Sequence, residues 1–287
     1  MNEFFDYPDL FKRADTLSNK SQRRYYYRLG AELILTVLAA LLGFAARFSS
    51  CYASAQLVVL FSLVVVLILR FFCNFEQTWY RARSAAESIK TLSWKYVMKS
   101  EPFDNEDAED IYCERIWSLL KEDKELVSQL TPKNTNASYI TDEMRSARAM
   151  QDSFRIEKYK LYRIRDQKDW YTGKSRKAKT ISTTLTVIIV LLVLLAVVIC
   201  ASRLLSGYPD NFPVDTLIVL IASIIAWGEA KNYSSLAEAY CFTANEINYL
   251  AETFDRDIKK TNLSVAVADA ENAFSREHSQ WLSRKDA

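Results

Sequence analysis

Apolar stretches without charge alternate along the chain with stretches that are dense in charge. The longest apolar stretch, residues 181–202, contains no charged residue, proline or glycine. As an α-helix it would be about 33 Å long, slightly more than the roughly 30 Å hydrocarbon layer of a bilayer. A buried helix in a soluble core is the alternative, but such a helix rarely runs so far without a polar position. The pattern therefore predicts a membrane-spanning helix.

Three further apolar stretches are shorter, and charged residues stand at their ends. Glu32 and Arg47 flank the first, so their charged heads must extend to the two membrane interfaces if that helix is to cross. Asp215 and Glu229 bracket the last, which must thin the bilayer or lean on neighbouring helices. Short loops join the first stretch to the second and the third to the fourth. The sequence thus predicts an all-α integral membrane protein with four transmembrane helices in two hairpins, at residues 30–48, 53–72, 181–202 and 213–229.

Long cytoplasmic helices are predicted to continue from spans two and four. Neither glycine nor proline occurs between Gly43 and Pro102, or after Gly228. Apolar or small side chains recur in both regions every three or four residues, which is the spacing of a helix-packing face. These faces offer a surface for homo-oligomer assembly. They comprise Trp79, Ala82, Ala86, Ile89, Ser93 and Tyr96, and then Leu236, Tyr240, Thr243, Ile247, Leu250, Phe254 and Ile258.

Lysine and arginine gather on one side of the predicted spans. They precede spans one and three and follow span two, whereas the short loops carry only Arg47 and Arg203. By the positive-inside rule, both termini and residues 75–175 are expected in the cytoplasm. The same architecture occurs twice, which predicts one unit at residues 1–135 and a second at 136–287. Two unrelated hairpins are the alternative, because sequence identity between the halves is slight.

The sequence contains no constellation of residues that is typical of an enzyme. The five cysteines form no CxxC pair, and the single histidine, His278, cannot complete a common zinc site. Neither an acid–base pair with a nucleophile nor a Gly-rich phosphate loop is recognisable. We therefore expect no catalytic residue, cofactor or metal. The basic run at residues 174–179 borders a span, so lipid head groups rather than nucleic acid are its expected partner.

The candidate polar groups inside the predicted spans are hydroxyls. None of the four cores holds a central Asp, Glu, Lys, Arg or His, whereas pumps and proton-coupled transporters usually place one there. Hydroxyls suit helix contacts or a weakly polar pore lining. The alternative is that each one bonds back to its own helix. The candidates are Thr36, Ser62, Thr183, Thr184, Thr186 and Ser223.

Three segments resemble a known family. Residues 78–103 (TWYRARSAAESIKTLSWKYVMKSEPF) resemble the segment after the membrane hairpin of SLATT domains, the two-transmembrane effector domains associated with SMODS nucleotidyltransferases and SLOG sensors in bacterial defence. DQKDWYTGKS at 166–175 is similar to the lead-in of a second such hairpin, and residues 271–285 are similar to the family's typical ending. The motif residues, expected to serve in packing or gating, are Trp79, Arg83, Glu87, Lys90, Trp94, Tyr96, Trp170, Tyr171, Glu277, His278 and Trp281.

The resemblance implies a membrane effector of an anti-phage system. Such an effector is expected in the bacterial inner membrane as a homo-oligomer, and a partner or second messenger triggers it to form a pore or disrupt the membrane. A sensor or signalling partner encoded nearby is implied as well. A non-conducting scaffold that recruits cytoplasmic partners is the alternative. For the aromatic motif residues the alternative role is anchoring at an interface, and for His278 it is packing.

Overall fold

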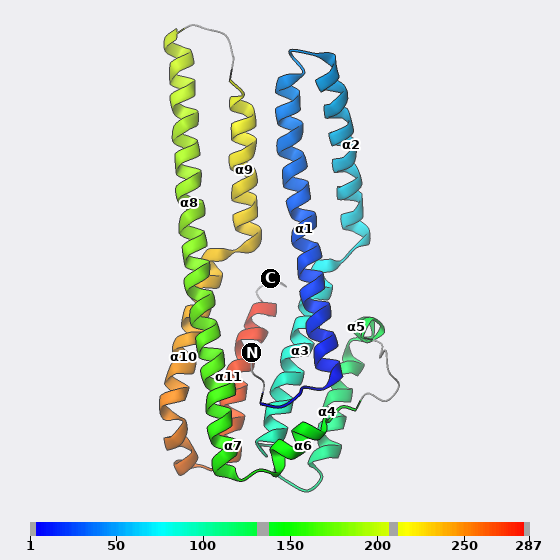
Figure 1. Cartoon of the computed structure of the whole chain (residues 1–287), viewed down its shortest axis with the longest axis vertical. Coiled ribbons are helices and arrows are strands. Elements are labelled where there is room, and N and C mark those ends of the chain that lie inside the picture. Colours follow the sequence, from blue (N-terminus) through cyan, green and yellow to red (C-terminus); the bar gives the residue numbers. More distant parts are fainter. Residues whose placement is uncertain (1–3, 131–137, 207–211, 284–287) are drawn as a thin grey trace. The chain divides into compact units, whose positions relative to one another are not determined.

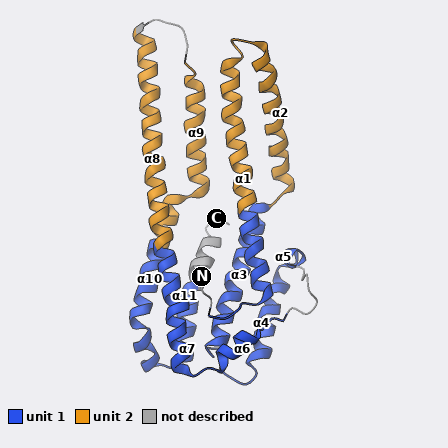
Figure 2. Ribbon diagram, in the orientation of Figure 1, with its two compact units in different colours: residues 1–22, 75–172, 241–287 blue, residues 23–74, 173–240 orange. Residues whose placement is uncertain are grey.

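A computed structural model describes residues 4–130, 138–206 and 212–283, except for the side chains of Ser206 and residues 275–283. In this described part the chain is helical and has no β-strand, which confirms the all-α fold class. The chain divides into two compact units, each assembled from segments far apart in the sequence (Figure 2). Unit 1 contains residues 1–22, 75–172 and 241–287, and unit 2 contains residues 23–74 and 173–240.

Unit 2 contains the apolar parts of four long helices (Figure 1): α1 (Asp9–Ala45), α2 (Ser50–Phe72), α8 (Asp166–Ser206) and α9 (Val214–Lys231). Three helices of the described chain are long and apolar enough to cross a membrane, namely α1, α2 and the continuous helix Asp152–Leu205 that includes α8. α9 is not among them, because it is short and carries charge in its first and last turns. A fourth span therefore stays a prediction.

Neighbouring helices of unit 2 contact each other at glycines. A Cβ atom on Gly43 of α1 would lie 2.7 Å from the side-chain nitrogen of Gln56 on α2. The same nitrogen donates a hydrogen bond of 3.2 Å to the carbonyl oxygen of Ala39. A Cβ atom on Gly228 of α9 would lie 3.8 Å from Leu185 of α8. Thus α1 contacts α2, and α8 contacts α9.

The prediction that spans two and four continue as unbroken helices is wrong. Cys73 follows α2 with extended backbone angles (φ −121°, ψ 96°), and its carbonyl accepts a 3.4 Å hydrogen bond from Arg28 before α3 (Phe75–Val97) begins. Asn232 ends α9 with left-handed angles (φ 46°, ψ 45°), and α10 (Tyr233–Lys260) follows. Asparagine adopts left-handed angles more readily than most residues and commonly ends helices. The helices after both spans are therefore separate elements.

The uninterrupted helices are those that lead into the apolar regions. α1 runs from the polar N-terminal segment to Ala45 without a break. α7 (Asp152–Tyr159) continues through a π-helical segment, η1 (Lys160–Arg165), into α8, so that one helix extends over 54 residues. Both α1 and this long helix begin in unit 1 and end in unit 2.

Unit 1 is built around α3. Its neighbours are α4 (Ala108–Glu122), α5 (Lys124–Gln129), α6 (Asp142–Ala149) and α11 (Leu263–Ser283). The predicted packing face of α3 is confirmed, because all its members are buried, none more than 7% exposed. On the predicted face of α10, Thr243, Ile247 and Phe254 are buried and the other members are half-buried. Both faces thus pack largely within a single chain, which leaves little of either for contact with a second copy.

Candidate functional site

A buried ion pair joins the long helix to α11 inside unit 1. Arg163, in η1, donates from Nε to Oε1 of Glu271 at 2.8 Å and from Nη2 to Oε2 at 2.6 Å. The Tyr159 hydroxyl, one turn earlier, donates to the same Oε1 at 2.9 Å. None of the three residues is more than 1% exposed. We call these three residues the Glu271 network.

The π-helical turn that carries Arg163 is an uncommon element. π-helices are rare, occur mostly as single turns within α-helices, and are frequent at functional sites. Arg163 and Ile164 are both buried within this turn. Lys160, at its start, forms an ion pair with Asp255 of α10. Side chains on two other helices therefore hold the turn that precedes α8.

Trp94 connects the Glu271 network to the N-terminal segment. Its indole Nε1 donates a hydrogen bond of 2.8 Å to the Tyr7 hydroxyl, in a site where Trp94 is 1% exposed. The Trp94 ring meets Phe5 edge-on at 4.9 Å and Tyr159 at 5.5 Å between centroids. Tyr159 in turn lies 5.4 Å from the ring of Phe254 on α10. This motif tryptophan therefore lies in the core of unit 1.

Tyr96 belongs to a second cluster, between α3, α4 and α6. Its hydroxyl donates to Oε1 of Glu109 at 3.1 Å, and Arg145 holds both Glu109 oxygens at 2.9 and 3.1 Å. Burial, and then the charge of Glu109, raises the pKa of Tyr96 to about 12. The hydrogen bonds from Arg145 lower the pKa of Glu109. Arg148 lies over the Tyr96 ring at 4.8 Å and donates to the Tyr96 carbonyl oxygen.

Three charged motif residues follow one another along α3. Arg83 pairs with Glu87 at 2.5 Å and with Asp15 of α1 at 3.5 Å. Lys90 is half-buried, and its burial, followed by the charge of Arg163, lowers its pKa. The charged side of α3 therefore faces both α1 and η1.

The remaining motif residues are aromatic or C-terminal. Trp79 is buried and stacks on Tyr80 at 4.5 Å. Trp170 is half-buried and meets the buried Tyr171 edge-on at 4.8 Å. The side chains of Glu277, His278 and Trp281 lie outside the described residues, so their predicted role is untested.

Four of the six predicted span hydroxyls bond back to their own helix. Each donates to the carbonyl four residues earlier, at 2.8 to 3.0 Å; these are Thr36, Ser62, Thr184 and Thr186. Thr183 is exposed and Ser223 is half-buried. A back-bonded hydroxyl presents little polarity beyond its own helix. These four hydroxyls therefore contribute little to a polar path along the helices.

Most of the surface of α2 is apolar and exposed. No residue of this helix is buried, and its large side chains include Leu57, Phe61 and Phe71 at 72%, 70% and 84% exposure. Isolated apolar side chains are normal on soluble proteins, but a whole exposed apolar helix is not. Lipid or other transmembrane helices are the surroundings in which such a helix is stable.

The Glu271 network was not predicted from the sequence. Arg163 and Glu271 stand 108 residues apart. Glu271 begins the segment that resembles the family's ending, but it is not one of the predicted motif residues. The only local signal is that Tyr159 and Arg163 are four residues apart, which places them on one helix face. Within the described residues, no group of His, Cys, Asp and Glu is arranged to hold a metal ion.

Long apolar helices joined to a polar helical unit define this chain as an all-helical membrane protein. Residues 8–156 match the family model of the SMODS and SLOG-associating 2TM effector domain 3, and residues 159–281 match that of domain 1. The first match alone covers more than half of the chain, which therefore belongs to the SLATT family and carries two SLATT domains in tandem. Comparisons with curated proteins and with solved structures give no match.

Proposed function

We propose that this protein is a membrane effector of a bacterial defence system, which assembles from several copies and opens an ion-conducting path when triggered. Both matched family models are described as effector domains with two transmembrane segments. The observation that carries the proposal is the apolar surface of α2, on which no side chain is buried. A surface of this kind is suited to lipid and to the helices of other copies.

Assembly through the apolar helices is proposed because the other packing faces make their contacts largely within one chain. The packing faces of α3 and α10 lie largely inside the chain, so they leave little for contact with a second copy. Four of the predicted span hydroxyls bond to their own helices, so they contribute little to a polar path within one copy. A path for ions would therefore form between copies. An apolar constriction that excludes water is sufficient to keep such a path closed.

The trigger is proposed to act on unit 1. SLATT domains are described as associating with SMODS and SLOG proteins, so a partner of this class, encoded nearby, is the proposed source of the signal. α1 and the helix Asp152–Leu205 provide the connection, because both begin in unit 1 and end in unit 2. α2 and α9 do not provide such a connection, because each ends at a break before the next helix begins.

The proposed location is the inner membrane, with both termini in the cytoplasm and α9 as a fourth span. Labelling of intact spheroplasts with an impermeant thiol reagent tests this orientation. Cys51, which is exposed at the start of α2, should react, while Cys113 of α4 and Cys241 of α10 should stay protected until the membrane is opened. The reverse pattern would contradict the proposed orientation.

Conductance is the decisive measurement, because a non-conducting scaffold shares every other feature. Expression together with the genomic partners should depolarise cells loaded with a potential-sensitive dye and stop their growth. Purified protein in planar bilayers should give discrete current steps. Crosslinking in membranes through Leu57→Cys, in a chain whose five native cysteines are replaced by serine, reports assembly. If the protein inserts and assembles but causes neither depolarisation nor current steps, the result would favour the scaffold function.

A further inference from the structure

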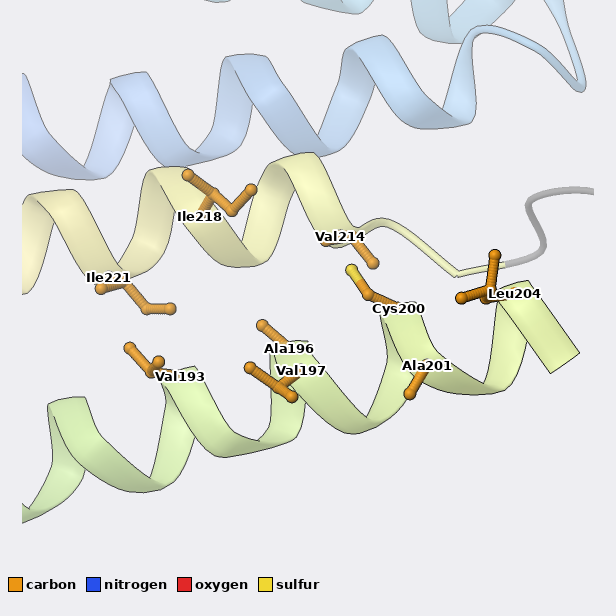
Figure 3. Close-up of a pocket in the computed structure, with 9 residues that line it drawn as sticks. All are labelled: Val193, Ala196, Val197, Cys200, Ala201, Leu204, Val214, Ile218 and Ile221. Carbon is orange, nitrogen blue, oxygen red and sulfur yellow. The ribbon is translucent and has the colours of Figure 1, made fainter.

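A groove with purely apolar walls lies between α8 and α9. Figure 3 shows Val193 and Cys200 of α8 pointing towards Ile221 and Val214 of α9 across it. The groove has a volume of about 570 Å³, within the range of roughly 300–1,000 Å³ typical of ligand pockets. It lies at the ends of the two helices near their connecting segment. The α8 wall is Val193, Ala196, Val197, Cys200, Ala201 and Leu204, and the α9 wall is Val214, Ile218 and Ile221.

The groove stays open because of the residues at each end of the pair. At the other end, α8 and α9 come close where Gly228 meets Leu185. Within the groove, Ala196 and Cys200 are too small to fill the space between the helices. The other pair differs, because Gln56 of α2 bridges to the backbone of α1. The α8–α9 pair therefore has room for a slender apolar molecule.

Among the described residues, two charged residues adjoin this end of the groove in the sequence, Arg203 on α8 and Asp215 in the first turn of α9. Arg203 lies between the groove residues Cys200 and Leu204, directly after the charge-free run 181–202. Its guanidinium donates to the carbonyl oxygen of Phe212, next to the start of α9, so it is held near the mouth. A guanidinium carries five N–H donors and matches the geometry of a phosphate. In a bilayer, this depth corresponds to the phosphate layer.

We propose that the groove binds one acyl chain of a membrane glycerophospholipid, whose phosphate contacts Arg203. The apolar walls match the chain, and the arginine at the mouth matches the head group. A second copy of this protein would insert a helix rather than a slender chain, and it would bring no phosphate to Arg203. The proposal rests on the proposed membrane placement of α9, but it requires neither conductance nor assembly.

Adjacent valines on α8 provide a matched pair for the test. Val197 lines the groove and Val198 does not, although the two are similarly exposed, at 58% and 64%. Full-length protein is reconstituted in vesicles of phosphatidylethanolamine and phosphatidylglycerol, extracted and washed with detergent. Native mass spectrometry then measures the number of phospholipids bound to each chain. The wild type and Val198→Phe should retain one phospholipid per chain, and Val197→Phe should lose it. Ala196→Leu, a smaller change in the same wall, should weaken retention if Val197→Phe does not fold.

A second comparison tests the head-group contact. Arg203→Gln should weaken retention about fivefold, as expected for one arginine near anionic lipid, while Arg47→Gln in the other short loop should leave it unchanged. Diacylglycerol, which lacks phosphate, should not replace the phospholipid. Equal retention by Val197→Phe and Val198→Phe would overturn the proposal. Crosslinking of Cys200 to a second copy of the chain would also overturn it. Since retention is measured without current, loss of conductance alone would leave this proposal standing.

Discussion

Arg163 and Glu271 lie 108 residues apart in the sequence and form a two-pronged ion pair whose side chains are 2% and 0% exposed. One belongs to the π-helical turn before α8 and the other to α11. Removing one partner of such a pair leaves the other charge buried without compensation, which typically costs about 3–5 kcal/mol. The stability of unit 1 therefore depends on a contact between two distant parts of the sequence.

Glu271→Gln is expected to lower the free energy of unfolding by about 3–5 kcal/mol, because Arg163 keeps its charge in a buried site. Chemical unfolding followed by circular dichroism of detergent-solubilised protein measures this. Arg145→Gln is the control, since Arg145 also holds both oxygens of a glutamate, Glu109, but with side chains 44% and 49% exposed. The control should cost no more than about 1 kcal/mol. An equal loss of unfolding free energy in the two variants would contradict the claim that burial makes the Arg163–Glu271 pair more important for stability.

Tyr7→Phe is expected to destabilise unit 1 by about 1–3 kcal/mol. The substitution removes the acceptor of the buried Trp94 indole N–H and leaves that donor unpaired. Tyr249→Phe provides the control, because Tyr249 is 67% exposed on α10. Tryptophan fluorescence and chemical unfolding report the change. A Tyr7→Phe variant as stable as the control would mean that water or another group satisfies the indole.

Alkaline pH is expected to weaken the fold through Tyr96. The pKa of its hydroxyl is raised from 10.0 to about 12 in the folded chain, so the unfolded chain releases its proton first. The contribution of Tyr96 is therefore fully present below about pH 10 and is lost as the pH rises towards 12. Across this pH interval, the free energy of unfolding should fall less steeply for Tyr96→Phe than for the wild type. Parallel curves would contradict the raised pKa.

Phe61→Arg is expected to impair insertion of α2, because an arginine near the centre of a transmembrane helix costs about 2.5–3.5 kcal/mol. Phe61 is 70% exposed in the structure, so the same change would be harmless if this face met water. Phe61→Leu is the apolar control. Carbonate extraction of membranes should release more of the arginine variant than of the control. Equal retention in the membrane fraction would mean that α2 does not face lipid.

Periodicity predicted the helices and the buried face of α3, because both depend on residues close together in the sequence. Ala82, Ile89 and Ser93 recur at three- and four-residue spacing, and all are buried as expected. The absence of glycine and proline was a weaker indicator that a helix continues without a break. The chain breaks at Cys73 and Asn232 without either, although the asparagine in this position is itself a signal for a helix end.

The candidate site was less accessible to prediction from the sequence than the fold. Several family-motif positions, among them Trp94 and Tyr96, have well-defined partners, but their partners Tyr7 and Glu109 were not predicted. No sequence periodicity relates the π-helical turn to Glu271. Those contacts form between separate helices, so they depend on how the helices pack.

The breaks at Cys73 and Asn232 give the four long helices unequal mechanical roles. An α-helix with intact hydrogen bonds resists torsion, whereas one residue with extended or left-handed angles can absorb rotation by changing its own dihedrals. We expect rotation about the axis of α1, an α-helix from Asp9 to Ala45, to pass along it from unit 1 to unit 2. We expect rotation of α3 or α10 to be taken up by dihedral changes at Cys73 or Asn232 before it reaches α2 or α9. α1 is therefore expected to transmit rotation, whereas α2 and α9 are free to follow their surroundings.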